Sequence, residues 1–255
     1  MDISNAEEVE RIVSAAKPDV VIHTAAMTNV DQCETDREGC WRTNVDAVQN
    51  IVRSCEQNNV RLIHVSTDFI FDGSHGPLDE NENPSPVNYY GESKLAAEEL
   101  IKKSKVQWAI LRTVLVYGIT KDMSRSNIVL WVKNSLEAGK TIQVVNDQFR
   151  TPTLAEDLAQ GCYLAAKHKA TGIYNISGKD FLSPYDIAIH TARFFDLDDT
   201  LIKKTDSSHF KQPAERPMIT GFIIDKARTD LGYEPHSFVE GISIIADQIK
   251  SPELA

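Results

Sequence analysis

The sequence lacks the marks of several protein classes. No apolar run approaches the roughly 20 residues that a membrane-spanning helix needs. The first residues, MDISNAEEVERIV, hold neither the basic segment nor the apolar core of a signal peptide. Acidic residues outnumber basic ones, and the formal net charge of -10 argues against bulk binding to DNA or RNA. We therefore expect neither a membrane nor a nucleic acid as a partner.

Cysteine is scarce as well. Cys33, Cys40, Cys55 and Cys162 form no Cys-x-x-Cys pair, and no further ligands cluster beside them. We expect no metal site. Because scattered free thiols suit a reducing compartment, we expect a cytoplasmic protein.

Glycine forms no phosphate-binding motif in this sequence. In a Gly-x-x-Gly-x-x-Gly loop, backbone N–H groups and a helix N-terminus hold a pyrophosphate. The 12 glycines here are scattered, and the pair Gly73 and Gly76 has no third member. We therefore expect this chain alone to bind a pyrophosphate weakly.

The sequence does contain short apolar runs that alternate with helical patterns. Continuous apolar strands separated by helices indicate a parallel sheet covered on both faces, so we predict a doubly wound, Rossmann-like α/β fold. The expected strands are 20–26, 60–67, 108–118, 141–145 and 172–178. The expected helices are 6–17, 36–58, 91–104, 127–140, 183–195 and 239–250.

Two expectations refine this scheme. Ser4 and Ser183 are the expected N-caps of the helices that follow them, with Pro184 at a first helical position. Residues 1–118 plus 171–179 are expected to form the cofactor-binding unit. Residues 119–170 and 180–255 are expected to form a smaller, discontinuous substrate lobe.

Ligands on such sheets bind outside the carboxyl ends of the strands, so the residues at those ends are candidates. Ala25 and Ala26 follow the first strand, where small side chains would let a ligand approach or let a helix pack closely. Thr67 and Asp68 end the second strand, where they could bind a carbonyl group or merely cap a turn.

Tyr90 and Lys94 are spaced by one helical turn. A nearby ammonium group lowers the pKa of a phenol, so this pair could pass a proton to a substrate oxygen. A tyrosine and a lysine on a helix surface would have the same spacing. The strand that ends in Ser-Thr-Asp upstream favours the catalytic interpretation.

These segments resemble the extended short-chain dehydrogenase/reductase family, and within it the dTDP-4-dehydrorhamnose reductase branch. The matches occur in family order and cover nearly the whole chain. They are VVIHTAAMTNVDQCE, NVDAVQNI, VSTDFIFDG, YYGESKLAAEE, LRTVLVYG, NDQFRTPT and GIYNISG.

The resemblance implies hydride delivery from NADPH or NADH to a keto group of a nucleotide-linked sugar, as in dTDP-rhamnose biosynthesis. Thr67 would orient the carbonyl group, and Tyr90 would be the general acid. Lys94 would lower the pKa of Tyr90 and bind the nicotinamide ribose. Asp68 would touch the sugar. The other implied cofactor contacts are Asp2, Ile3, Ala25, Ala26, Thr28 and Asn44. A homodimer through helices 36–58 and 91–104 is also implied.

The chain departs from the family pattern at its start. Such folds begin with a strand, the Gly-rich loop, a helix and a second strand, roughly 50–60 residues that precede the segment matched here. Without them, strand 20–26 becomes an edge with unpaired backbone groups. The chain could be a truncated product, its edge could pair with another chain, or the rest of the protein could lie outside this sequence.

Smaller departures concern the substrate. Leu115 stands where the branch usually has Trp, and Arg150 stands where it usually has Gly. Arg150 and Arg216 could bind a diphosphate, although Arg216 could also be a solvated loop charge. An alternative function is a non-catalytic subunit that resembles the regulatory subunit of methionine adenosyltransferase. A dehydratase usually has an Asp-Glu pair after the threonine, and here only Asp68 is present.

Overall fold

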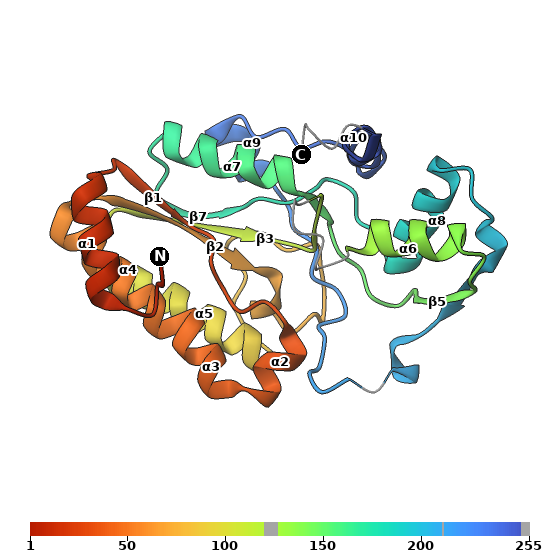
Figure 1. Cartoon of the computed structure of the whole chain (residues 1–255), viewed down its shortest axis with the longest axis horizontal. Helices are drawn as coiled ribbons and strands as arrows, with labels where there is room; N and C mark the ends of the chain where they lie inside the picture. The colour runs from red at the N-terminus through yellow and green to blue at the C-terminus, as the bar shows by residue number, and fades with distance from the viewer. Residues whose placement is uncertain (120–126, 211, 251–255) are drawn as a thin grey trace.

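The computed structural model of the chain describes residues 1–119, 127–210 and 212–250. At its centre is a parallel sheet with the strand order β1-β2-β3-β7. Helices cover both faces of this sheet (Figure 1), which confirms the predicted α/β fold. The strands are β1 (Val20–His23), β2 (Arg61–Thr67), β3 (Trp108–Thr113) and β7 (Gly172–Asn175).

One face of the sheet packs against three helices. Val9, Ile51 and Ile101 lie one on each helix, and they meet Leu62 and Ile110 of the sheet in a single buried cluster. This cluster sets the distance between the helix layer and the sheet. The helices are α1 (Ala6–Ala16), α4 (Ala47–Asn58) and α5 (Tyr89–Lys103).

The single helix predicted over 36–58 is wrong, because it is a series of shorter segments. Asp36 breaks the run: it follows one helix, and its carboxylate accepts a hydrogen bond from the N–H group of Gly39 in the next. The segments before α4 are α2 (Val30–Thr35), α3 (Arg37–Trp41) and a π-helical turn (Arg42–Asp46). The predicted cap of α1 is also wrong: Asn5 caps it, because the Ser4 hydroxyl donates to Asp2.

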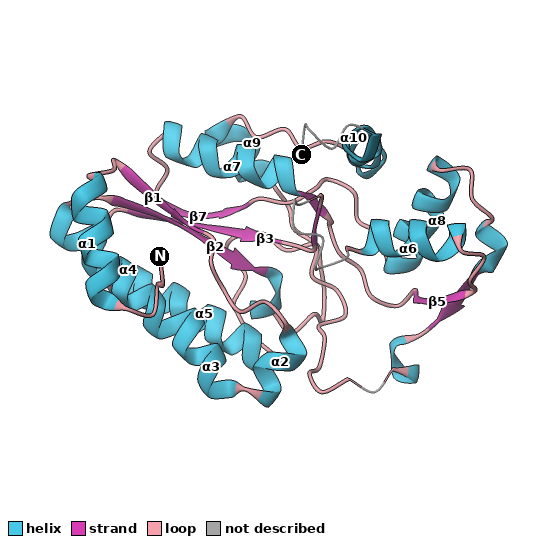
Figure 2. Cartoon of the chain, viewed as in Figure 1, coloured by secondary structure: helices cyan, strands magenta, loops and turns pink. Residues whose placement is uncertain are grey.

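The opposite face of the sheet packs against α7 and α9, which the sequence did not predict (Figure 2). Cys162 and Leu231 of these helices meet Ile63 and Leu111 of the strands. The helices are α7 (Ala155–Lys167) and α9 (Asp225–Leu231).

The remaining elements lie beyond the carboxyl ends of the strands, on the right of Figure 1. Ser183 caps α8 in a reciprocal capping box with Asp186, and Pro184 begins the helix, as predicted. The helices here are α6 (Ile128–Glu137), α8 (Pro184–Phe194) and α10 (Phe238–Lys250). The strand pairs are β4 (Val116–Tyr117) with β6 (Thr153–Leu154), and β5 (Ile142–Val145) with β8 (Ile202–Thr205). Short 3-10 turns are η2 (Asp68–Ile70), η3 (Asp199–Leu201) and η4 (Ser207–His209).

The division of the chain into two units at residue 118 stays a prediction, and its segments 120–126 and 251–255 lie outside the described residues. Within the described sheet β1 lies at one edge, as expected, and its Ile22 is exposed. Nowhere in the described part of the chain is a helix both long and apolar enough to cross a membrane.

Candidate functional site

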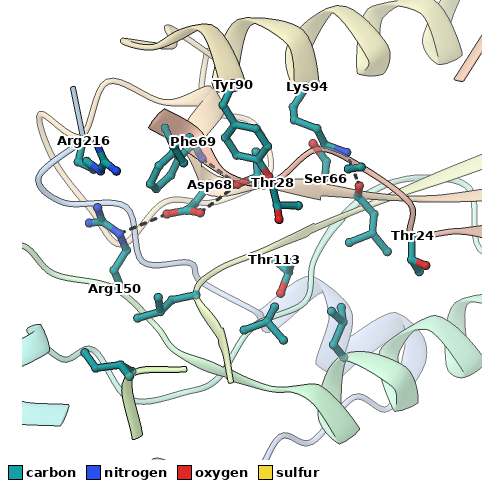
Figure 3. A pocket seen from close by; sticks show the side chains of 18 of the residues that line it. Thr24, Thr28, Ser66, Asp68, Phe69, Tyr90, Lys94, Thr113, Arg150 and Arg216 are labelled. Carbon is teal, nitrogen blue, oxygen red and sulfur yellow. Dashed lines mark hydrogen bonds and ion pairs between the residues drawn. The ribbon is translucent and has the colours of Figure 1, made fainter. Parts of the chain in front are cut away.

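The largest group of predicted site residues surrounds a cavity at the carboxyl ends of β1, β2 and β3. Its volume is about 560 Å³. Tyr90 and Lys94 reach into it from α5, and Asp68 lies beside Tyr90 with Arg150 further to the left in Figure 3. The sites predicted from separate strand ends therefore meet in one place.

The start of α5 determines where Tyr90 lies. The Asn88 side chain caps the helix by accepting a hydrogen bond from the N–H group of Gly91, at 2.8 Å. A Cβ atom on Gly91 would overlap the carbonyl oxygen of Phe69, so only glycine lets α5 approach the η2 turn this closely. Tyr90 is thereby held beside Thr67, with its ring edge-on to Phe69.

Burial dominates the electrostatics of Tyr90. Removal from water raises the pKa of its phenol, and a hydrogen bond with Thr67 opposes that rise. The net shift is upward, so the phenol is protonated at neutral pH. A proton donor to a substrate oxygen requires this state.

Lys94 is buried and lines the cavity. Its Nζ donates to the carbonyl oxygen of Val65 at 2.8 Å and lies 3.2 Å from Nε2 of His64. Burial lowers the pKa of Lys94 to about 8, although the charge of Glu98 opposes this shift. Lys94 can therefore gain or lose a proton near neutral pH.

Asp68 and Arg150 face each other across the far end of the cavity. Nε of Arg150 lies 3.5 Å from Oδ2 of Asp68, and Thr220 donates to the same carboxylate. Burial raises the pKa of Asp68, and the charge of Arg150 counteracts this. The guanidinium also donates to the carbonyl oxygens of Phe149, Met218 and Pro217. Arg150 thus anchors the loop around 217–218 as well as lining the cavity.

Arg216 also lines the cavity, and it is not a solvated loop charge. Its two terminal nitrogens lie 2.7 and 2.8 Å from the carboxylate oxygens of Asp31. The pair joins α2 to the loop that carries Arg216.

The other predicted cofactor contacts divide into two groups. Ala26 and Thr28 line the cavity. Asn44 does not, but its amide binds the backbone of Met27 and the hydroxyl of Ser93 and so holds the loop after β1 against α5. The positions not brought to the cavity are Asp2, Ile3, Ala25 and Asn44.

Sequence reasoning missed several residues of the cavity wall. Phe69, Thr113 and Gln148 line it. Leu115, which the sequence indicated as a departure that concerns the substrate, lines it too, with a left-handed φ of 36°. Phe69 had a signal, since it directly follows the Thr-Asp pair. Arg112 lies on β3, whose end reaches the cavity, but its side chain is buried against Glu98 and does not line the cavity.

A second groove, of about 380 Å³, continues the cavity over α6 and β5. Ile128 and Pro184 line both hollows. Trp131 and Phe210, both partly exposed, form the aromatic wall of the groove.

Comparisons with known proteins place this site in context. The family model described as "RmlD substrate binding domain" matches residues 1–251. A crystal structure of dTDP-4-dehydrorhamnose reductase from Bacillus anthracis in complex with NADP is 27% identical, with a TM-score of 0.91 over 97% of this chain and 87% of that chain.

Two curated relatives carry different functions. A probable low-salt glycan biosynthesis reductase, Agl14 of Haloferax volcanii, is 30% identical over 91% of this chain and 78% of its own length. The methionine adenosyltransferase 2 subunit beta of Rattus norvegicus is 26% identical over 86% of this chain. The chain spans 65% of the length of that subunit.

Proposed function

The chain belongs to the family of the RmlD substrate binding domain, and from that premise we propose that it is an NAD(P)H-dependent reductase of a nucleotide-linked keto sugar. The observation that carries the proposal is the meeting of Thr67, Tyr90 and Lys94 at one cavity. The similarity to dTDP-4-dehydrorhamnose reductase supports a dTDP-linked 4-keto sugar as the substrate.

The residues of the chain perform the proton-transfer half of such a reaction. The bound nicotinamide cofactor supplies the hydride. The hydroxyl of Thr67 orients the substrate carbonyl group, and the phenol of Tyr90 gives its proton to the carbonyl oxygen. The structure does not bear out the expectation that Lys94 lowers the pKa of Tyr90, because burial raises that pKa and the charge of Lys94 is not among the effects on it. Lys94 lies one helical turn from Tyr90, where it would return a proton to the phenolate that results.

The cavity fits the nicotinamide and ribose end of the cofactor. Thr24, Ala26 and Thr28 are small and leave room beside Lys94 at the end of β1. Lys94 and Tyr90 would bind the ribose hydroxyls.

The nucleotide of the substrate would extend from the cavity into the adjoining groove. Trp131 offers an aromatic surface for a base, and Gln143 offers an amide. Arg216, held at the cavity by Asp31, would meet the diphosphate.

A regulatory subunit is the second candidate, because the chain resembles the methionine adenosyltransferase 2 subunit beta. Association with a catalytic subunit, with a change in that subunit's activity, would support it.

We also propose a cytoplasmic homodimer in which α4 and α5 meet the same helices of the second copy. Light scattering of the purified chain measures its mass directly.

The test of the proposed function is a reduction assay of the purified chain with a dTDP-4-keto-6-deoxysugar. NADPH, NADH and reduced nicotinamide mononucleotide are supplied in turn at high concentration. Reduced nicotinamide mononucleotide lacks the adenylate and the pyrophosphate bridge, so it tests binding and hydride transfer at the cavity alone. Turnover with any of the three that is lost in Tyr90→Phe supports the proposal. Turnover that persists in Tyr90→Phe contradicts it.

A further inference from the structure

Lys94 is the first member of a buried chain of hydrogen-bonding groups. Its Nζ lies 3.2 Å from Nε2 of His64, and Nδ1 of His64 lies 3.0 Å from Nδ1 of His23. The register of the sheet explains the second contact, because His23 and His64 are direct partners on β1 and β2. Their rings stack with centroids 5.1 Å apart.

Both imidazoles are neutral at physiological pH. Burial, together with the positive charge of Lys94, lowers the pKa of His23 to about 4 and that of His64 well below its usual value. A neutral imidazole has one N–H group, so its other nitrogen can only accept a hydrogen bond. The protonation state of Lys94 therefore determines which ring nitrogen bears the hydrogen in His64, and His64 determines it in His23.

Two arrangements satisfy every contact. In the first, charged Lys94 donates to Nε2 of His64, whose Nδ1–H donates to His23, and His23 has its hydrogen on Nε2. In the second, neutral Lys94 accepts from Nε2–H of His64, whose Nδ1 accepts from Nδ1–H of His23. The two arrangements differ by one proton at Lys94, and no ring needs to rotate between them.

We propose that His64 and His23 form a proton wire that returns to Lys94 the proton that it loses when it reloads Tyr90. One proton enters at Nε2 of His23. The Nδ1 proton of His23 then moves to Nδ1 of His64, and the Nε2 proton of His64 moves to Nζ of Lys94. Each histidine gains a proton on one ring nitrogen and loses one from the other, so both rings stay neutral. The net result is one proton delivered to Lys94.

The outer end of the wire is Nε2 of His23, on the edge strand of the described sheet. Within the described residues this nitrogen is buried and has no hydrogen-bond partner, so the proton donor to the wire would be a water molecule that reaches it at the sheet edge. Two titratable groups, Glu98 and Cys40, act on the charge of Lys94, and both raise its pKa. Glu98 is bound to Arg112, and neither residue hydrogen-bonds to His64 or His23. His64 and His23 touch no reacting atom and act through Lys94.

The wire can be tested on the chain without any ligand. Long-range proton–nitrogen NMR spectra of histidine-labelled protein report which ring nitrogen bears the hydrogen, recorded from about pH 6 to about pH 10. Because a neutral amine accepts a hydrogen bond better than it donates one, His64 should switch from Nδ1–H to Nε2–H as Lys94 loses its proton. His23 should switch from Nε2–H to Nδ1–H at the same midpoint, near the pKa of about 8 of Lys94.

Matched variants make the result decisive. Lys94→Met should abolish the switch, and His23→Gln at the sheet edge should remove the shared midpoint while His64 stays buried. The exposed His75 serves as an internal control and should show no switch at that midpoint. The proposal is wrong if both tautomers stay constant through the titration of Lys94, or if only one of the two histidines changes its tautomer.

The role of the wire in catalysis rests on the proposed function. If the chain turns over, His23→Gln should lower kcat about tenfold or more, leave KM unchanged and increase the solvent deuterium isotope effect. An unchanged kcat and isotope effect would overturn the catalytic role. A coupled switch in a chain without reductase activity would support the wire and count against the proposed function, so the two failures are distinguishable.

Discussion

Glu98 on α5 and Arg112 on β3 form a two-point ion pair in the core. Nε and Nη2 of Arg112 lie 3.1 and 2.8 Å from the two carboxylate oxygens of Glu98. Both side chains are at most 1% exposed. Glu98 lies one helical turn beyond Lys94, so the pair fixes to the sheet the helix that carries the catalytic groups.

Removal of one residue of the Glu98–Arg112 ion pair should destabilise the fold. Arg112→Met leaves the carboxylate of Glu98 buried without its main partner and should lower the free energy of unfolding by roughly 3–5 kcal/mol. The double variant Glu98→Leu with Arg112→Met should recover much of this loss, because no charge is then left unpaired. Urea unfolding measures both. A loss of less than about 1 kcal/mol in Arg112→Met would contradict the account.

Stability should depend on pH through His23. Its folded-state pKa is about 4, against 6.5 in the unfolded chain, so between these values the unfolded state binds more protons. The stability contributed by neutral His23 is present in full above pH 6.5 and is lost as the pH falls through 4. This contribution to the free energy of unfolding is about 3 kcal/mol. Between pH 7 and pH 4, the free energy of unfolding of the wild type should fall more steeply than that of His23→Gln, which keeps only the contribution of neutral His64. Equal slopes in the two proteins would contradict this role of His23.

Gly91 should be intolerant of a side chain. A Cβ atom there would overlap the Phe69 carbonyl, so Gly91→Ala should push α5 away from η2 and cost about 1–3 kcal/mol. Because Tyr90 moves with the helix, reductase activity should fall further than stability explains. Ala96→Gly, on the same helix and away from the cavity, is the control for helix propensity. Equal activity in Gly91→Ala and the wild type would show that the close approach is unimportant.

Arg216 should act on binding rather than on chemistry. A charge-assisted hydrogen bond contributes about 1.5–3 kcal/mol, so Arg216→Ala should raise the KM for the nucleotide sugar about 10- to 100-fold with little change in kcat. Arg228→Ala, which removes a charge outside the cavity, should leave KM unchanged. An unaltered KM in Arg216→Ala would mean that Arg216 only ties its loop to Asp31.

The sequence predicted the features that depend on local pattern. The alternation of apolar strands and helices indicated the parallel sheet, and the four-residue spacing of Tyr90 and Lys94 indicated that both share one helix face. The ends of separate strands converged as expected, because parallel strands place their carboxyl ends at the same edge of a sheet.

The missed features depend on contacts between distant residues. α7 packs on the sheet through small residues such as Gly161 and Ala165, which give a weak apolar period. The contact between His23 and His64 exists only because β1 and β2 pair in one register. The partners of Arg150 and Arg216 lie on segments far away in the chain, so no local pattern could reveal that both guanidinium groups are bound.

The most direct test of the central claim compares two neighbouring tyrosines. Tyr90→Phe removes one hydroxyl from the cavity, and Tyr89→Phe removes one from the adjacent ring, which packs beside Trp41 outside it. Reduction of a dTDP-4-keto-6-deoxysugar is followed by the loss of reduced-nicotinamide absorbance. The account predicts a fall in kcat of about 10²- to 10⁴-fold in Tyr90→Phe and almost none in Tyr89→Phe. Equal rates in the two variants, both close to the wild-type rate, would contradict it.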